Sequence, residues 1–340
     1  MAEDWAAQVE ALIETYHERG WTDGLPIVPP TEKKIRAFLE AGGFEPGEAI
    51  TSIKDRNVSV LADKVAINAI MAGCRPEYMP VIAAALRAMG DPRWGYHGPA
   101  TSTGGAAVLL LVNGPIARRL GINCADNLFG PGWRANATIG RAVRLVMRNV
   151  IGTLPGKLDR STLGHPGKYT YCIAEDEEES PWPPLHVERG FRMDQSTVTV
   201  LAALSPHQFY NQLSSSAEGI LATACAQMRI SAGTGMQPEY VLIFAGEHRA
   251  IFEKDGYSKE DIRRFCFAHT QCSHAELKRI HLMPGEIEPG DEERMKPLVP
   301  APEDFIVVSA GSRAGAFSAY IPGWAGKRSS ESVTVEIHCP

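Results

Sequence analysis

The stretch Ala106-Ala-Val-Leu-Leu-Leu-Val112 decides the fold. It has the length of a strand, and it is apolar at every position rather than at alternate positions. A strand of this kind is buried on both faces, which is typical of a partly parallel sheet covered by helices. Asn113-Gly-Pro115 follows directly and ends the strand.

Helical and strand patterns alternate around this central strand. Residues 138–150 place apolar side chains on one stripe and Arg141, Arg144 and Arg148 on another, which predicts a helix with a solvated basic face. The alternative is that these arginines contribute to anion binding. Further helices are predicted at 5–18, 31–41, 61–72, from Pro76 onward, and at 217–228, 247–254 and 258–269. Strands are predicted at 169–174, 197–204, 240–245, 305–309, 316–321 and 333–338. The alternation predicts an α/β fold with a mixed, partly parallel sheet covered by helices, and α+β is the alternative.

Composition along the chain predicts four segments. Residues 1–45 form a predicted N-terminal helical cap, and residues 46–283 form the main α/β core. Residues 284–302, rich in Pro, Gly and Glu, are the predicted linker, and 303–340 return to the core as strands. The sequence shows no internal repeat.

Composition and charge exclude several classes of function. Of the 340 residues, 44% are hydrophobic and 22% are charged, which is typical of a folded globular protein. The formal net charge of -6 argues against a nucleic-acid partner, because phosphate binding needs a basic surface. No apolar run approaches the ~20 residues of a membrane span, and the first residues lack the pattern of a signal peptide. We therefore expect a cytoplasmic protein with no membrane partner and with reduced cysteines.

A glycine-rich loop, Gly130–Asn136, leads into the helix predicted at 138–150. Free backbone N–H groups and the helix dipole favour an anion at such a position, and Arg134 and Asn136 add side-chain donors. We predict that this loop binds a carboxylate or phosphate, with Trp133 in the same site. The alternative is that Thr138 caps the helix and the glycines make a tight turn, since the pattern matches no nucleotide-binding motif.

Cys74 lies between a helix end and a helix start, beside Arg75. Both a helix N-terminus and a neighbouring guanidinium lower a thiol pKa, so Cys74 is a candidate nucleophile or redox thiol and Arg75 a candidate substrate contact. The alternative is a buried cysteine that acts as a small hydrophobe. Cys124 and Cys172 are weaker candidates, and the chain contains no C-x-x-C pair.

The segment Tyr96–Gly105 precedes the central strand and carries an imidazole and several hydroxyls. His97 is a candidate general acid or base because histidine titrates near neutral pH; the alternative is a loop residue bonded to backbone. Ser102 and Thr103 are candidate substrate contacts. The segment lacks the G-x-S-x-G elbow, so it does not indicate a serine hydrolase.

Five consecutive acidic residues, 175–179, precede a proline-stiffened segment. Carboxylates, an aromatic and an imidazole in one segment suit acid/base chemistry, so Glu178, His186 and Glu188 are predicted catalytic residues. We expect His186 and Glu188 to orient one another, and the alternative is a solvated acidic loop. The remaining candidate substrate contacts are Asn113, Tyr171 and Trp182.

Cys266, His269, Cys272 and His274 have the residue types of metal ligands at short spacing. Their spacing matches no standard zinc site, so no metal site is predicted. A histidine at a helix C-terminus explains His269 more simply. No cofactor motif is recognised, and the cofactor stays unknown.

Four strings resemble a bacterial family: Gly20–Pro30, Lys64–Tyr78, Gly132–Ala142 and Ser180–Arg189. The family looks like the long component associated with, and sometimes fused to, a short module named for a Sec-Gly-Ser-Cys or Cys-Gly-Ser-Cys (UGSC) motif. That motif is absent here, so the resemblance implies a redox partner protein that acts in trans. Because the module resembles parts of reductases that cleave bonds in amino acids, the resemblance also implies redox-coupled small-molecule chemistry. It assigns no catalytic residues.

These observations together predict a cytoplasmic enzyme that acts on a small anionic molecule by acid/base chemistry. The sequence does not decide how a bond would be cleaved: hydrolysis, elimination and a thiol- or redox-coupled reduction are all compatible with it. We also expect a homo-oligomer. The competing prediction is a substrate-binding or scaffold subunit that presents its ligand to a separate catalytic protein.

Overall fold

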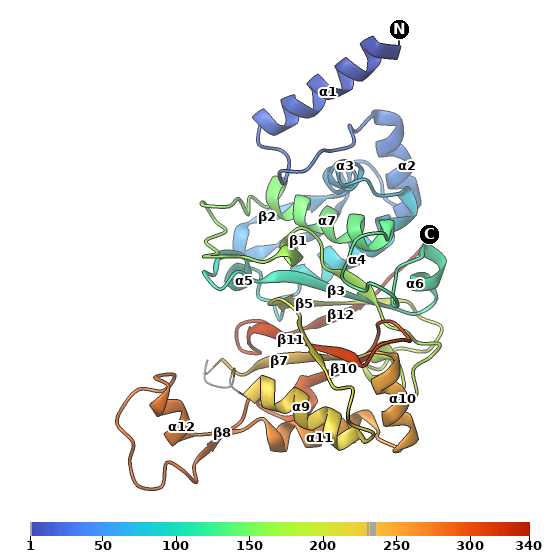
Figure 1. Ribbon diagram of the computed structural model, residues 1–340. Helices are drawn as coiled ribbons and strands as arrows, with labels where there is room; N and C mark the ends of the chain where they lie inside the picture. The colour runs from blue at the N-terminus through green and yellow to red at the C-terminus, as the bar shows by residue number, and fades with distance from the viewer. Residues whose placement is uncertain (1, 230, 232–235) are drawn as a thin grey trace.

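One mixed sheet of eight strands organises the described part of the chain (Figure 1). The structure is a computed structural model, and it describes residues 2–229, 231 and 236–340. The strands of the sheet are β3 (Ala107–Asn113), β4 (Cys172–Ala174), β5 (Thr197–Ala203), β6 (His207–Tyr210), β7 (Pro238–Phe244), β10 (Phe305–Ser309), β11 (Phe317–Gly326) and β12 (Val333–Glu336). Their order is β10-β7-β11-β5-β3-β4, with β12 also pairing with β5 and β6 with β11. Pairs β3–β4 and β7–β10 are parallel and the others antiparallel, which confirms the predicted α/β fold.

The sheet folds over into two layers. We call β3, β4, β5 and β12 the first half-sheet, and β6, β7, β10 and β11 the second half-sheet. They meet where Gly323 of β11 pairs with Ala203 of β5, and the chain runs from β5 into β6 across the same point. Leu109 and Leu111 of β3 lie in one buried cluster with Ile243 of β7, so the two half-sheets pack face to face.

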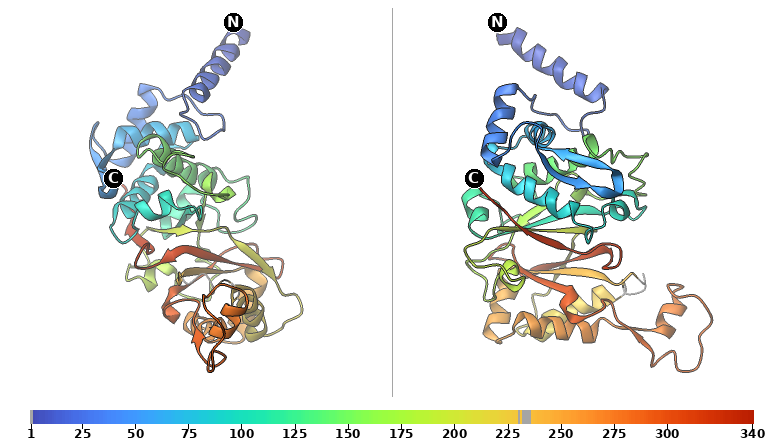
Figure 2. Two further views of the ribbon diagram at one scale, coloured as in Figure 1. Left: turned by 90° about the vertical axis from the view of Figure 1, so that its left-hand side faces the viewer. Right: turned by 180° about the vertical axis from the view of Figure 1, so that it is seen from behind.

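Helices cover the outer face of each half-sheet (Figures 1 and 2). The first half-sheet is covered by α3 (Ala62–Ala72), α4 (Met79–Gly90) and α7 (Arg134–Asn149), and the second by α9 (Ala217–Arg229), α10 (Gly246–Lys254) and α11 (Lys259–His269). Leu110 of β3 faces the first group of helices, and Leu242 of β7 faces the second. The result is four layers in the order helices, sheet, sheet, helices. Strands buried on both faces explain why the central apolar runs do not alternate with polar residues.

The two half-sheets have the same topology. β3 pairs parallel with β4 and antiparallel with β5, and β7 pairs in the same way with β10 and β11. The pair Val112 and Ala174 in the first half-sheet matches the pair Phe244 and Ser309 in the second. Each half also contributes a strand to the other, because β6 follows β5 but pairs with β11, and β12 follows β11 but pairs with β5. The topology is therefore repeated although the sequence shows no repeat.

The remaining elements lie around this core. They are the helices α1 (Ala2–Glu18), α2 (Glu32–Gly42), α5 (His97–Thr101), α6 (Pro115–Leu120), α8 (Leu185–Glu188) and α12 (His274–Arg279), and the short strands β1 (Ala49–Ile53), β2 (Val58–Leu61), β8 (Cys272–Ser273) and β9 (Met295–Lys296). Figures 1 and 2 show α1 projecting from one end of the molecule and the β8–α12 segment from the other. The stretch predicted as a linker, 284–302, contains β9, which pairs with β8. Within the described residues, no helix combines the length and apolarity needed to cross a membrane.

The basic stripe of α7 differs from its prediction as a solvated face. Arg141 binds both carboxylate oxygens of Asp23 at 2.8 Å, and its side chain is only 13% exposed. Arg148 donates to the carbonyl oxygen of Gly20 at 3.0 Å. The arginines therefore hold the connection between α1 and α2 against α7, because the carbonyls and the carboxylate of that connection need donors.

Candidate functional site

A pocket of about 470 Å³ lies where the parallel strands β3 and β4 end. We call it the strand-end pocket. The side chains and backbone that line it include Gly114, Arg118, Asn123, Cys124, Trp133, Glu175, Asp176, Glu177 and Glu178. Ligands of α/β proteins commonly bind at the carboxyl ends of parallel strands, because the loops that follow them converge there.

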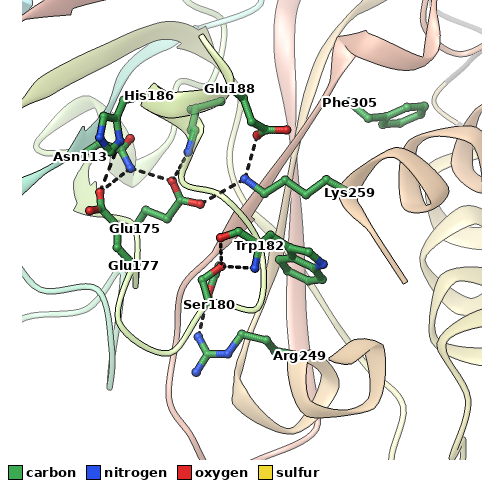
Figure 3. A network of polar contacts seen from close by, with 12 residues as sticks. Asn113, Glu175, Glu177, Ser180, Trp182, His186, Glu188, Arg249, Lys259 and Phe305 are labelled. Carbon is green, nitrogen blue, oxygen red and sulfur yellow. Dashed lines mark hydrogen bonds and ion pairs between the residues drawn. The ribbon is translucent and has the colours of Figure 1, made fainter. Parts of the chain in front are cut away.

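Asn113, the last residue of β3, holds two carboxylates in place (Figure 3). Its side-chain Nδ2 donates to Glu175 Oε2 at 2.7 Å and to Glu177 Oε1 at 2.9 Å. Because an amide group carries two N–H donors, both are used on carboxylates. The backbone N–H of Gly114 adds a second bond to Glu177 Oε1, at 2.7 Å. Glu177 is thus fixed through one oxygen, and its Oε2 has no hydrogen-bond partner within the described residues.

Glu175 is buried and joins an ion network that reaches the second half of the molecule. Its Oε2 accepts from the backbone N–H of Leu185 at 2.8 Å, and its Oε1 lies 3.4 Å from Lys259 Nζ. Lys259, whose side chain is only 4% exposed, also binds Glu188 at 2.8 Å, and Glu188 accepts from Arg263 at 2.9 Å. Buried charges require such partners because desolvation is costly.

His186 lies beside Glu177 rather than Glu188, which corrects the expected pairing of His186 with Glu188. The imidazole is fully buried, and its Nδ1 is 3.7 Å from Glu177 Oε1, just beyond hydrogen-bond distance. Neither ring nitrogen has a hydrogen-bond partner in the described part of the chain. Buried polar groups normally have partners, so this imidazole is an exception that calls for an explanation.

Asp176 links the ends of the two half-sheets. Its Oδ2 accepts from Arg249 Nη1 at 2.8 Å, and the same nitrogen donates to Ser309 Oγ at 2.6 Å. The backbone N–H of Asp176 donates to the carbonyl of Ser309 at 2.7 Å, and Gly311 donates to the carbonyl of Cys124 at 2.8 Å. The loops after β4 and β10 are therefore bonded to each other, which closes the sandwich beside the strand-end pocket.

Glu178, a predicted catalytic residue, lines the strand-end pocket and forms an ion pair with Arg118 of α6. Both side chains are largely exposed, at 68% and 79%. Exposed ion pairs contribute little to stability, because water screens them. The pair therefore leaves both groups free to exchange partners with a bound molecule.

Cys74 differs from what its sequence neighbours suggested, and Cys124 is the cysteine at the pocket. Burial raises the pKa of Cys74 to about 12, and its Sγ donates to the carbonyl oxygen of Thr138 at 3.2 Å. The prediction of a lowered pKa is wrong, because burial outweighs the nearby positive charge of Arg134. Cys124 lines the strand-end pocket instead. Burial and the negative charge of Asp176 raise its pKa to about 11.

The predicted anion loop uses its donors within the protein. Helix α7 begins at Arg134, four residues before the predicted start, and the guanidinium donates to the carbonyl of Gly73 at 2.9 and 3.0 Å. Asn136 is buried and exchanges two hydrogen bonds with the backbone of Asn123, at 2.8 and 3.0 Å. Of the three side chains predicted for this loop, Trp133 lines the strand-end pocket.

The His97 segment lies at the opposite end of β3 from the strand-end pocket. His97 starts α5 and is exposed, and its backbone N–H donates to Asp55 at 3.4 Å. Ser102 Oγ accepts from Trp324 Nε1 at 2.7 Å, and the carbonyl of Thr103 accepts from a backbone N–H. The structure therefore does not bring these residues together with the carboxylates.

The other predicted contacts also lie outside the strand-end pocket. Tyr171 lines a separate pocket of about 540 Å³, and its hydroxyl donates to the carbonyl of Leu204 at 3.2 Å. Trp182 is buried in the core of the second half, where its Nε1 donates to the carbonyl of Tyr257 at 2.8 Å. Arg75 is exposed next to a short 3-10 helix, Pro76–Tyr78.

The four residues with metal-ligand types do not converge. Cys266 is buried in the same apolar cluster as Cys225, and Cys272 Sγ donates to the carbonyl of Arg229 at 3.1 Å. His269 Nδ1 lies 2.8 Å from the carbonyl of Phe265. Within the described residues, no group of three or more His, Cys, Asp or Glu side chains could hold a metal ion.

Sequence reasoning missed Arg118, did not single out Glu177 within the acidic run, ranked Cys124 as a weaker candidate and treated Asn113 as a substrate contact. The available signal was position, since Asn113 and Glu177 lie at or just after the ends of two strands predicted for a partly parallel sheet. Comparison with protein-family models found no match to this chain, and comparison with curated proteins found none either. The interpretation of the site therefore depends on its geometry.

Proposed function

We propose that the chain is an enzyme that transfers protons to and from a small molecule in the strand-end pocket, with Glu177 as general acid and base. One observation carries the proposal. Glu177 lines the pocket, and its Oε1 is held by Asn113 and by the backbone N–H of Gly114. A carboxylate fixed at one oxygen presents the other in a defined direction, which proton transfer requires.

The residues around Glu177 support this role. In elimination, Glu177 removes a proton from a C–H, N–H or O–H group of the bound molecule and returns it to the leaving group. In hydrolysis, Glu177 removes the proton from a solvent water that attacks the bound molecule and returns that proton to the leaving group. His186 acts as a positioning residue, because it is fully buried and cannot touch the substrate. A shift of about 1 Å or less would let Nδ1 donate to Glu177 Oε1 and steady its charge. The buried Glu175 and Lys259 hold Asn113 and α8 in place behind the site.

The lining favours a substrate with hydrogen-bond donors, such as an ammonium or hydroxyl group. Four of the lining residues are acidic, and Arg118 is the cation among the lining residues that the structure describes. An anionic substrate would depend on Arg118. The volume of about 470 Å³ suits a small molecule.

Hydrolysis or elimination is favoured over thiol redox chemistry. Cys124 is the cysteine that lines this pocket, and its raised pKa keeps the thiol protonated at neutral pH. A protonated thiol is a poor nucleophile and a poor partner for thiol–disulfide exchange. A redox partner in trans, as implied by the family resemblance, would therefore need a different cysteine.

A substrate screen with two matched variants tests the proposal. Mixtures of small amines, amino alcohols and hydroxy acids are examined for binding by ligand-observed NMR and for turnover by mass spectrometry. Glu177→Gln should keep binding but lose about 10²–10⁴-fold in turnover, the usual contribution of a general acid or base. Glu179→Gln makes the same change on a residue that pairs with Arg313 and does not line the pocket, so it should behave as wild type.

Two outcomes would contradict the proposal. Turnover by Glu177→Gln at the wild-type rate would remove Glu177 from the chemistry. Binding by the wild-type protein without turnover of any bound compound would instead support the competing prediction of a substrate-binding subunit.

A further inference from the structure

A second pocket, of about 570 Å³, lies beside helix α7. We call it the basic pocket. Its charged lining residues are Asp23, Arg144, Arg148, Asp159 and Lys168. It shares no lining residue with the strand-end pocket, so it is a separate site.

The chain around the basic pocket concentrates positive charge. Residues 127–174 contain seven Lys and Arg side chains and one acidic residue, Asp159. The next segment, 175–188, contains six acidic residues and no Lys or Arg. In a protein with a net charge of -6, this division places a local positive field beside α7 and a negative one at the strand-end pocket.

Asp159 is shared by two cations, which leaves positive charge unneutralised. Its Oδ2 lies 2.5 Å from Arg144 Nη2 and 2.8 Å from Lys168 Nζ. Burial alone would raise the pKa of Asp159, but hydrogen bonds from Lys168 and Ser161 outweigh that effect and hold it below the usual 3.8. The carboxylate is therefore ionised at neutral pH and balances one of the two cations. A guanidinium carries five N–H donors, and within the described residues Arg144 spends only one nitrogen on Asp159.

Arg148 adds a third positive charge to the same pocket. Its Nη2 donates to the carbonyl of Gly20, which is neutral, and no carboxylate pairs with it in the described part of the chain. Its Nε is buried and has no hydrogen-bond partner among the described residues. Arg160 stands on the loop that lines the pocket and donates to the carbonyl of Gly156, a lining residue. Arg141 is not part of this surplus, because Asp23 neutralises it.

We propose that the basic pocket binds a small anion with two or more negative charges, of the phosphate or polycarboxylate class. The surplus of Arg144, Arg148 and Lys168 over Asp159 supplies the attraction. Guanidinium groups present paired donors that match phosphate and carboxylate oxygens. The volume of about 570 Å³ suits a small molecule, and the net negative charge of the protein opposes binding of a long polyanion. This site is independent of the chemistry proposed for Glu177.

Isothermal titration calorimetry of the full chain at low salt tests the proposal, with inorganic pyrophosphate and citrate as separate probes. At least one probe should bind, and the affinity should fall as salt is added because the attraction is electrostatic. Arg148→Gln should weaken binding on the order of tenfold, the usual effect of losing a charge-assisted contact, and Arg148→Lys should keep most of it. Arg36→Gln, which removes an exposed cation that lines neither pocket, is the matched control and should bind as wild type.

The proposal is overturned if neither probe binds the wild-type protein, or if Arg148→Gln binds as tightly as wild type. Thermal unfolding shows whether Arg148→Gln is folded, since Arg148 also holds Gly20. If it is not folded, Lys168→Gln replaces it, because Lys168 is another lining cation of the basic pocket, and unchanged affinity in that variant overturns the proposal equally. None of these results bears on Glu177, so the two proposals fail separately.

Discussion

The two half-sheets share a topology but carry different residues where their parallel strands end. In the first, the last parallel pair of β3 and β4 is Val112 with Ala174, and the next residues along the two chains are Asn113 and Glu175. The matching positions in the second half-sheet, by the same register, are Ala245 and Ala310. One half therefore ends in an amide and a set of carboxylates, and the other ends in small residues.

This difference shows how a repeated scaffold comes to carry one polar site. The carboxylates of the first half are neutralised by cations from helices of the second, since Lys259 of α11 reaches Glu175 and Arg249 of α10 reaches Asp176. The second half supplies support and counter-charge rather than a second copy of the site. Function therefore follows the residues at the strand ends, not the fold that both halves share.

The largest expected effect is a loss of stability from the apolar core of the second half. Phe252 is fully buried, and its ring centroid lies 4.6 Å from that of Phe244. Phe252→Ala should cost about 3–5 kcal/mol of unfolding free energy, because it removes buried apolar surface and leaves a cavity. Urea unfolding measures the loss, and a loss below about 1 kcal/mol would show that this core can collapse around the cavity.

Glu175→Gln tests whether the first half depends on charge rather than volume. The substitution keeps the shape but leaves the buried Lys259 with Glu188 as its remaining carboxylate. We expect a loss of about 3 kcal/mol in urea unfolding, the usual cost of breaking a buried ion pair. Glu179→Gln, an exposed position, should stay within about 0.5 kcal/mol of wild type. Equal stability of the two variants would mean that Glu175 contributes shape alone.

Asp159→Asn should lose about 2 kcal/mol at neutral pH, because two charged hydrogen-bond donors lose their carboxylate. The pKa of Asp159 is lowered in the folded protein, so its contribution is complete well above the usual value of 3.8. The contribution is lost as pH falls below 3.8 toward the folded-state value. The gap between wild type and variant in urea unfolding should therefore close in acid, and a gap that is constant from pH 7 to pH 3 would contradict this linkage.

The strand and helix pattern could be predicted from the sequence, but the two-layer arrangement could not. The apolar runs at 106–112 and 305–309 appear as β3 and β10 with shifts of one residue or none. The folding of the sheet depends on the pairing of Gly323 with Ala203, a contact between residues far apart in the chain that no local pattern encodes. The strand β6 was missed because His207–Tyr210 is mostly polar and exposed.

Site residues that lie at the ends of strands could be predicted from the sequence. Properties that depend on burial in the folded protein could not. The acidic run after β4 and Asn113 after β3 were both found. Thr138 looked like a helix cap, yet its hydroxyl donates to the carbonyl of Arg134 inside the helix, so α7 begins a turn earlier. Cys74 looked activated by its neighbours, but desolvation is a property of the packed structure and reverses the sign of its pKa shift.

Thiol reactivity gives the smallest expected effect and compares the cysteines of the first half directly. At pH 7 a thiol with a pKa of about 11 is ionised on the order of once in 10⁴ molecules, so Cys124 should react with iodoacetamide far more slowly than a free thiol. Glu178→Gln removes one of the negative charges that raise this pKa, and because Glu178 is exposed the rate should rise only by about two- to threefold. Cys74, whose raised pKa does not depend on Glu178, is the internal control and should keep its rate.

Peptide mapping by mass spectrometry, with samples taken over time, measures the labelling rate of each cysteine separately. Faster labelling of Cys74 than of a free thiol would contradict its raised pKa. It would support a reactive thiolate at the end of α3.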